Sequence, residues 1–270
     1  MSARANDRVV VVVTGAGSGI GRATALAFAA KGARVAACDV DRARVDALAA
    51  ELGDRALAVD VVDVADRAAV AAFADAVHAR AEVDVVVNNA GVAVGGTFVE
   101  TPLADWDWLL GVNLYGVVHG CHAFVPRMIA RGRGGHVVNV ASIWGIYPAP
   151  NASAYVASKF AVLGFSQSLR GELAPHRIGV TAICPGMIAT NIVADGRLSA
   201  GEQVARGKVI EMFKKRGAPP SLVADAIVDA VRTNPAVRTV GNDARVLALL
   251  QKIAPRTAAR LGAAVAKRLR

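Results

Sequence analysis

The chain has 270 residues, enough for one large α/β domain, and alternating strand and helix patterns leave no linker at which to divide it. We therefore expect a single domain over residues 1–270. Lys and Arg outnumber Asp and Glu by 31 to 22, which gives a formal net charge of +9. Residues 1–7 are polar, and no apolar run approaches the roughly 18 residues of a membrane span, so neither a leader nor a membrane anchor is expected.

The three cysteines, Cys38, Cys121 and Cys184, fall within apolar strand or helix patterns. Neither they nor the five histidines show the spacing of a metal site or a disulfide framework. We expect no metal cofactor, and buried, reduced thiols in a cytoplasmic protein.

The first predicted element is a strand at residues 8–13, a β-branched run typical of a strand buried on both faces. A glycine-rich loop follows, and then the helical pattern of residues 22–31. Glycines let the backbone approach a pyrophosphate, and the helix N-terminus offers free N–H groups to an anion. An ordinary turn is the alternative, which the position directly after a buried strand disfavours. The loop residues expected to contact a dinucleotide are Gly15, Gly17, Ser18, Gly19, Ile20 and Gly21.

The second predicted strand ends at Asp39. A carboxylate at this point accepts hydrogen bonds from the adenosine ribose hydroxyls and repels a 2′-phosphate. Ser18 and Val40 are uncharged, so neither offers the cation that a phosphorylated ribose needs. Arg42 and Arg44 belong to the next helical pattern, where we expect them to be solvated. The sequence therefore favours NAD over NADP.

Seven strands are predicted in total, and helical stretches separate them. Right-handed crossovers between parallel strands place helices on both faces of a sheet. The expected fold class is α/β, a single-domain Rossmann fold with a doubly wound parallel sheet of seven strands. The predicted strands lie at residues 8–13, 34–38, 56–60, 83–87, 135–140, 178–184 and 236–240.

Tyr155 and Lys159 stand four residues apart, on one face of a predicted helix. A lysine charge about 5 Å from a phenolate, at an effective dielectric constant near 20, contributes roughly 3 kcal/mol and lowers the tyrosine pKa by about two units from ~10. Such a tyrosine can exchange protons near neutral pH. The same spacing also occurs on solvated helix faces, so it indicates acid/base chemistry only together with the dinucleotide loop.

Further motifs accompany these, and the full set in chain order is Thr14 to Gly21, Asp60-Val61, Asn88 to Gly91, Asn113, Ser142, Tyr155 with Lys159, and Pro185-Gly186. Taken in order, these motifs resemble those of the short-chain dehydrogenase/reductases with subunits of about this size. The resemblance covers roughly residues 8–240, and it is specific because seven separated motifs agree in order. It implies an oxidoreductase that transfers a hydride between a nicotinamide cofactor and a secondary alcohol or ketone.

The resemblance also implies roles in catalysis. Ser142 would hold the substrate oxygen, and Tyr155 would give that oxygen a proton in reduction or accept one in oxidation. Lys159 would lower the tyrosine pKa and hydrogen-bond the nicotinamide ribose. Asn113 would hold a water that links Lys159 to solvent, although a polar residue that caps a helix kink is the alternative.

Further cofactor contacts are implied by the same resemblance. Asp60 would hydrogen-bond the adenine beside Val61, and residues 88–91 would bring backbone close to the adenosine ribose, with a plain turn as the alternative. Ile188 would orient the nicotinamide ring, and Thr190 would touch the carboxamide or the pyrophosphate. Beyond the loop, the implied contacts are Asp39, Asp60, Val61, Asn89, Ala90, Gly91, Tyr155, Lys159, Pro185, Gly186, Ile188 and Thr190.

The family resemblance further implies the strand order 3-2-1-4-5-6-7. The helices that carry Asn113 and Tyr155 are the two that pack between subunits in such proteins. A homodimer or homotetramer is therefore expected.

The open end of the nicotinamide site is expected to be mostly apolar, with a lid over about residues 187–217. This favours an apolar alcohol or ketone such as a steroid, terpenoid or lipid. For Trp144 and Tyr147, ordinary packing is the alternative. Charged lid side chains could meet an acidic substrate, but solvation is their usual state. The expected substrate contacts are Ser142, Trp144, Tyr147, Tyr155 and Met187.

The basic C-terminal extension, about residues 244–270, departs from the minimal family pattern. Residues 244–253 predict one helix, and Pro255 can open a second. In this second helix one face would carry Ala258, Leu261, Val265 and Leu269, and the opposite face Arg256, Arg260, Lys267 and Arg270.

No acidic residue follows Asp243, so this extension carries much of the net charge. We expect a helix docked on its own subunit or on a neighbour. The alternative is a dinucleotide-binding protein whose tail attaches it to an anionic membrane surface or an acidic partner. Nucleic acid is not an expected partner, because the extension lacks aromatic residues for stacking.

Overall fold

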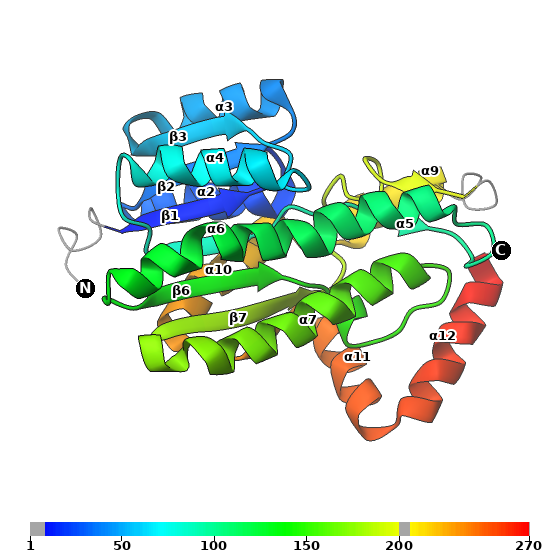
Figure 1. Cartoon of the computed structure of the whole chain (residues 1–270). Coiled ribbons are helices and arrows are strands. Elements are labelled where there is room, and N and C mark those ends of the chain that lie inside the picture. The colour runs from blue at the N-terminus through cyan, green and yellow to red at the C-terminus, as the bar shows by residue number, and fades with distance from the viewer. Residues whose placement is uncertain (1–8, 200–205, 270) are drawn as a thin grey trace.

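A parallel sheet of seven strands forms the centre of the protein, with helices on both faces (Figure 1). The computed structural model describes residues 9–199 and 206–269, and the side chains of residues 265–269 lie outside this description. The strand order is β3-β2-β1-β4-β6-β7-β9, which is 3-2-1-4-5-6-7 when the seven predicted strands are numbered in sequence. The expected fold class and strand order are both confirmed. The strands are β1 (Val10–Thr14), β2 (Arg34–Asp39), β3 (Ala56–Val61), β4 (Val85–Asn88), β6 (Gly135–Val140), β7 (Ile178–Pro185) and β9 (Val237–Val240).

The alternation of side chains along β1 separates two core layers. Val10 and Val12 belong to the layer that includes side chains of helices α4, α6 and α7. Val11 and Val13 belong to the layer that includes side chains of α2, α3 and α10. Because successive residues of a strand point to opposite faces, a continuous β-branched run fills both layers at once.

The helices agree with the predicted alternation of strands and helices. Short 3-10 turns join several of them: η1 (Gly53–Arg55), η3 (Ile143–Gly145) and η4 (Ala174–His176). The α-helices are α2 (Gly19–Ala30), α3 (Arg42–Leu52), α4 (Arg67–His78), α5 (Leu103–Leu110), α6 (Gly116–Ala130), α7 (Ser153–Leu173), α9 (Arg206–Arg216), α10 (Pro220–Thr233), α11 (Asn242–Ile253) and α12 (Pro255–Leu269).

A continuous helical stretch of 28 residues, Leu103–Ala130, joins α5 and α6 through the π-helical turn η2 (Gly111–Tyr115). A window of 18 residues within it has a mean hydropathy of 1.2, so the stretch is long and apolar enough to cross a membrane by length and composition. The expectation that no such run exists is therefore wrong. In the fold, 44% of the apolar window is buried, and Val117 and Phe124 pack in the core layer beside α4 and α7. A core helix passes the same test, so this stretch is weak evidence for a membrane span.

Two short strands were not predicted. β5 (Val94–Gly95) pairs in parallel with β8 (Arg197–Leu198) and ties the connection after β4 to the predicted lid. Two-residue strands leave no periodic pattern in a sequence, and their pairing depends on the tertiary structure. Residues 200–205 of the predicted lid lie outside the described residues.

The C-terminal extension forms the two predicted helices, α11 and α12, which make a V at the end of the chain (Figure 1). Ala258 is fully buried, but Leu261, predicted on the same face, is 51% exposed. The side chains of Val265 and Leu269 lie outside the described residues. The predicted apolar face of α12 is therefore only partly packed on the protein.

Buried amide side chains connect the sheet to α7 beneath the site. Asn88 Nδ2 donates to Asn139 Oδ1 at 2.9 Å, and Asn139 Nδ2 donates to Ser166 Oγ at 3.0 Å. A Cβ atom at Gly120 of α6 would lie 2.1 Å from Asn88 Oδ1. Since Asn88 is 1% exposed and engaged in this network, it cannot move aside without breaking a buried hydrogen bond.

We predict that Gly120→Ala lowers the free energy of unfolding by about 1–3 kcal/mol, the usual range for overpacking a core. Gly171→Ala is the control, because nothing lies within 4 Å of its Cβ position on α7. Alanine forms helix better than glycine, so this control should raise stability by up to about 1 kcal/mol. Urea denaturation measures both values, and equal midpoints for the two variants would contradict the prediction.

Candidate active site

Ser142, Tyr155 and Lys159 come together at the carboxyl end of β6. Ser142 follows this strand, and the first two turns of α7 carry Tyr155 and Lys159. The Ser142 hydroxyl lies close enough to Tyr155 to lower the pKa of its phenol. Lys159 Nζ lies 5.7 Å from the centroid of the Tyr155 ring and donates to the Val140 carbonyl at 3.0 Å. All three predicted side chains are buried, with exposed fractions of 8%, 9% and 3% in sequence order.

Burial controls the proton affinities of this group. Burial raises the pKa of Tyr155 to about 12, and the hydrogen bond from Ser142 offsets only part of this effect. Burial also lowers the pKa of Lys159 to about 8. The predicted decrease of the tyrosine pKa is therefore wrong for the protein alone. The prediction assumed a solvated pair, whereas desolvation disfavours both the phenolate and the ammonium.

Asn113 joins the turn after β4 to α7. Its Oδ1 accepts from Val92 N at 2.8 Å, and its Nδ2 donates to Val92 O at 3.0 Å and to Ser158 Oγ at 3.2 Å. A Cβ atom at Gly91 would lie 3.4 Å from both Asn113 Oδ1 and Lys159 Nζ. The structure thus places Asn113 near the lysine, within a π-helical turn. The predicted role of Asn113 in holding a water stays a prediction.

The glycine loop and the start of α2 form a surface suited to an anion. Gly15 and Gly19 have φ angles of 61° and 50°, which favour glycine. A Cβ atom at Gly21 would lie 2.1 Å from the Gly15 carbonyl oxygen, so the loop closes tightly on itself. Among the described residues, the Ser18 side chain makes no capping hydrogen bond, and no acid lies in the first turn of α2. The N–H groups of this helix end therefore fit a pyrophosphate.

The motif after β4 supports the loop directly. Asn89 Nδ2 donates to the carbonyl oxygens of Thr14 and Gly15 at 2.9 and 3.1 Å. The backbone N–H groups of Asn89 and Ala90 both donate to Thr14 Oγ1. Asn89 and Ala90, which are predicted to contact the adenosine ribose, therefore hold the glycine loop in place.

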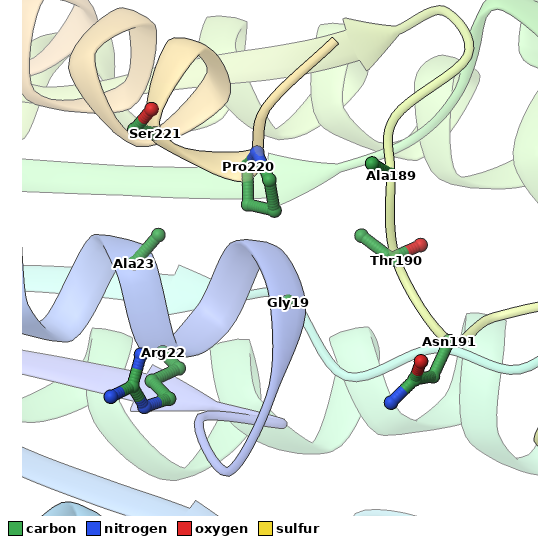
Figure 2. Close-up of a pocket in the computed structure, with 8 residues that line it drawn as sticks. All are labelled: Gly19, Arg22, Ala23, Ala189, Thr190, Asn191, Pro220 and Ser221. Atoms are coloured by element: carbon green, nitrogen blue, oxygen red, sulfur yellow. The ribbon is translucent and has the colours of Figure 1, made fainter. Parts of the chain in front are cut away.

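A cavity of about 360 Å³ lies between the first turn of α2 and the start of the predicted lid (Figure 2). The predicted contacts Gly19 and Thr190 face each other here, since a Cβ atom at Gly19 would lie 3.0 Å from Thr190 Cγ2. Sequence analysis missed the remaining lining residues, because their proximity arises only in the fold. They are Arg22, Ala23, Ala189, Asn191, Pro220 and Ser221.

Asp39 lies at the end of β2, against the glycine loop. Its carboxylate accepts from Gly17 N at 2.8 Å and from Asp41 N at 3.1 Å. The neighbouring β3 ends with Asp60 and Val61, whose backbone is in register with Cys38 and Asp39. The residues predicted to contact the adenosine therefore share one edge of the sheet.

Arg44 differs from its prediction as a solvated side chain. A Cβ atom at Gly17 would lie 2.6 Å from Arg44 Cβ and 2.9 Å from Asp39 Cγ, so the three residues are adjacent. The Arg44 guanidinium pairs with Asp195 at 3.2 Å and with Asp41 at 3.3 Å. Two carboxylates thus engage the cation nearest to the predicted ribose site. Arg42 is exposed and pairs with Asp46 at 3.6 Å, as expected of a solvated side chain.

The substrate side of Tyr155 is aromatic. The Trp144 ring packs edge-on against the Tyr155 ring, with 5.7 Å between centroids. Trp106 and Trp108 pack in the same apolar cluster, so all three tryptophans of the chain lie with Tyr155. Arg197, a lid cation that could have met an acidic substrate, lies over Trp108 and pairs with Asp105 at 2.8 Å.

Two predicted substrate contacts, Tyr147 and Met187, also bond to the C-terminal helices. Tyr147 Oη donates to the carbonyl of Ala258 in α12 at 3.0 Å, and this tyrosine packs with α11 and α12. Met187 N donates to Asp243 Oδ2 at 2.7 Å. Met187 also lines a second cavity, of about 850 Å³, beside α10, β9 and α11.

Within residues 9–199 and 206–269 no cluster of His, Cys, Asp and Glu could hold a metal ion.

Comparison with known proteins defines the class. Residues 9–200 match the family model described as short chain dehydrogenase. The chain therefore belongs to the short-chain dehydrogenase/reductase family of oxidoreductases.

Two mycobacterial proteins and one crystal structure illustrate the similarity. The chain is 47% identical over 264 residues to "Probable oxidoreductase EphD" of Mycobacterium tuberculosis, covering 93% of this chain but 45% of EphD. It is 41% identical over 263 residues to "Putative oxidoreductase SadH" of the same organism, covering 94% of each chain. A short chain dehydrogenase/reductase from Burkholderia phymatum in complex with NAD has a TM-score of 0.84 at 29% identity, covering 90% of this chain and 92% of that one. The chain thus spans less than half of EphD.

We predict that Lys159→Met raises the melting temperature relative to wild type more at pH ~7 than at pH ~9.5. The pKa of Lys159 falls from 10.5 to about 8 on folding. The unfolded chain therefore binds more protons between these values, and wild-type stability rises with pH across this window. The advantage of the variant should be largest below pH 8 and shrink above it.

Scanning calorimetry at the two pH values measures this difference. Lys214→Met is the control, because that lysine is exposed on α9 and its effect should change little with pH. An advantage of Lys159→Met that stays constant or grows with pH would contradict the prediction.

Proposed function

We propose that this enzyme transfers a hydride between NAD and an apolar secondary alcohol or ketone. One observation carries the proposal: Ser142 is close enough to Tyr155 to lower the pKa of its hydroxyl, while the Tyr155 ring packs against Trp144. Two hydroxyl groups thus meet at the edge of an aromatic cluster. Such a site suits a substrate with one reactive oxygen on an apolar body.

The nicotinamide supplies or accepts the hydride at the substrate carbon. In reduction, Ser142 holds the carbonyl oxygen and Tyr155 donates its proton to the oxygen as the hydride arrives. A tyrosine pKa of about 12 keeps this proton in place at neutral pH. In oxidation, Tyr155 accepts the hydroxyl proton. The positive charge of Lys159 stabilises the transient phenolate in both directions.

NAD is the proposed cofactor because Asp39 presents a carboxylate at the end of β2. The nearest cation, Arg44, is already engaged by Asp195 and Asp41. A 2′-phosphate would therefore meet the Asp39 charge without a free cation to compensate for it.

We also propose a cytoplasmic homodimer or homotetramer. Tyr115 and Phe160, on the helical segments predicted to lie between subunits, are 55% and 41% exposed. Contact between subunits would remove these aromatic surfaces from water. The three cysteines are free and buried, as suits a reducing compartment.

We expect Tyr155→Phe to lower kcat by at least 10²-fold, the lower range for loss of a general acid/base. The variant keeps the ring and therefore the packing against Trp144. A panel of secondary alcohols and ketones, assayed by nicotinamide absorbance, measures kcat, and fluorescence titration measures NAD binding. Tyr115→Phe is the control, since its ring is exposed. Retention of a tenth of wild-type kcat by Tyr155→Phe would disprove the assignment.

We expect wild-type kcat/KM to favour NAD over NADP by at least about tenfold, equivalent to about 1.4 kcal/mol. Asp39→Asn should reduce this ratio, because it removes the charge and keeps an oxygen that accepts from Gly17 N. Asp46→Asn removes an exposed charge on α3 and should leave the ratio unchanged. Equal use of both cofactors by the wild type would show that Arg44 turns from Asp195 to the phosphate.

A further inference from the structure

The outer face of the C-terminal hairpin, α11 with α12, carries large apolar side chains exposed to solvent. Val246, Leu249 and Ile253 are 64%, 58% and 69% exposed, and Leu261 is 51% exposed. The first three are spaced by three and four residues, so they form one stripe along α11. Among the described residues, twelve large hydrophobic side chains are exposed, and four of them lie in this hairpin. The apolar exposure is therefore concentrated.

Basic side chains border the stripe. Arg245, Lys252, Arg256 and Arg260 are all exposed, and no ion pair is formed by these four within the described part of the chain. No acidic residue follows Asp243 in the sequence to neutralise them. The hairpin thus presents apolar and cationic groups on one surface.

This surface is held in a fixed orientation by small residues on the inner side. Ala244 and Ala258 are fully buried, and Ala258 accepts the hydrogen bond from Tyr147 Oη. A Cβ atom at Gly262 would lie 2.6 Å from that same hydroxyl oxygen, so α12 approaches Tyr147 closely. Leu247 and Leu250 of α11 also pack on this inner side. Val246, Leu249 and Ile253 are exposed, so the stripe faces outward.

We propose that the hairpin α11–α12 docks on an anionic membrane surface. Val246, Leu249 and Ile253 enter the boundary between headgroups and acyl chains, and the basic side chains contact lipid phosphates. The positive charge of the hairpin favours an anionic bilayer over a second copy of the chain as its partner. A symmetric contact between two copies would bring the same cations together without acidic partners. The proposal is independent of the hydride-transfer reaction.

Vesicle sedimentation tests the proposal with the full chain. We expect binding to vesicles of mixed phosphatidylcholine and phosphatidylglycerol, and at least tenfold weaker partition to pure phosphatidylcholine. Raising NaCl from about 0.05 M to about 0.5 M should weaken the binding, because the Debye length shortens.

Variants separate the apolar from the electrostatic contribution. Leu249→Ser/Ile253→Ser and Lys252→Gln/Arg256→Gln should each lower partition at least tenfold. Val99→Ser is the control for Val246→Ser, because Val99 is also exposed, at 92%, and only Val246→Ser should weaken binding.

Arg67→Gln/Arg133→Gln removes two exposed charges from other surfaces and should change partition less than twofold. Catalytic activity and melting temperature should stay at wild-type values in all these variants, since every substituted side chain is exposed.

Three outcomes would overturn the proposal. The first is equal binding to neutral and anionic vesicles, or no binding to either. The second is loss of oligomer mass in Leu249→Ser/Ile253→Ser, measured by light scattering, which would assign the stripe to a second copy. The third is unchanged vesicle binding by both Leu249→Ser/Ile253→Ser and Lys252→Gln/Arg256→Gln.

Discussion

Lys159 is 3% exposed, and its ammonium group donates to the carbonyl oxygen of Val140. Removing this cation from water is unfavourable, and the lowered pKa of about 8 expresses that cost. The arrangement needs β6 to end beside α7, so that a backbone carbonyl meets the side chain. It also needs Tyr155 one turn earlier on the same helix. This buried contact thus ties α7 to β6 at the point where Ser142 and Tyr155 come together.

The parallel sheet brings the remaining groups to the same edge. Carboxyl ends of parallel strands lie side by side, so the loop after β1, Asp39 after β2 and Ser142 after β6 become neighbours despite their separation in sequence. Amide side chains keep this edge in register, because Asn89 holds the glycine loop and the buried Asn113 ties Val92 to Ser158. Hydrogen bonds of this kind favour one arrangement of the polar groups at the edge.

The C-terminal hairpin, α11 with α12, packs beside two segments that adjoin the candidate site. It packs against the protein through Ala244, Ala258, Leu247 and Leu250, and the Tyr147 hydroxyl donates to the Ala258 carbonyl. These contacts keep Tyr147 beside the turn that carries Trp144. At the other end of α11, Asp243 accepts from Met187 N at the start of the lid. The hairpin therefore touches both the turn after β6 and the segment after β7. A ligand that holds the hairpin would act on elements that adjoin the catalytic group.

Sequence patterns alone determined the seven strands, the two C-terminal helices and the ordered motifs, because local periodicity and glycine spacing express them directly. The tertiary structure decided what depends on burial and distant pairing. Burial raises the pKa of Tyr155, whereas the sequence predicted a decrease. Burial also lowers the pKa of Lys159. Arg44 lies against Gly17, and β5 pairs with β8, through contacts that no local pattern contains. Leu261 is exposed because the close contact of α12 is made at Ala258 and Gly262, a choice that helical periodicity cannot reveal.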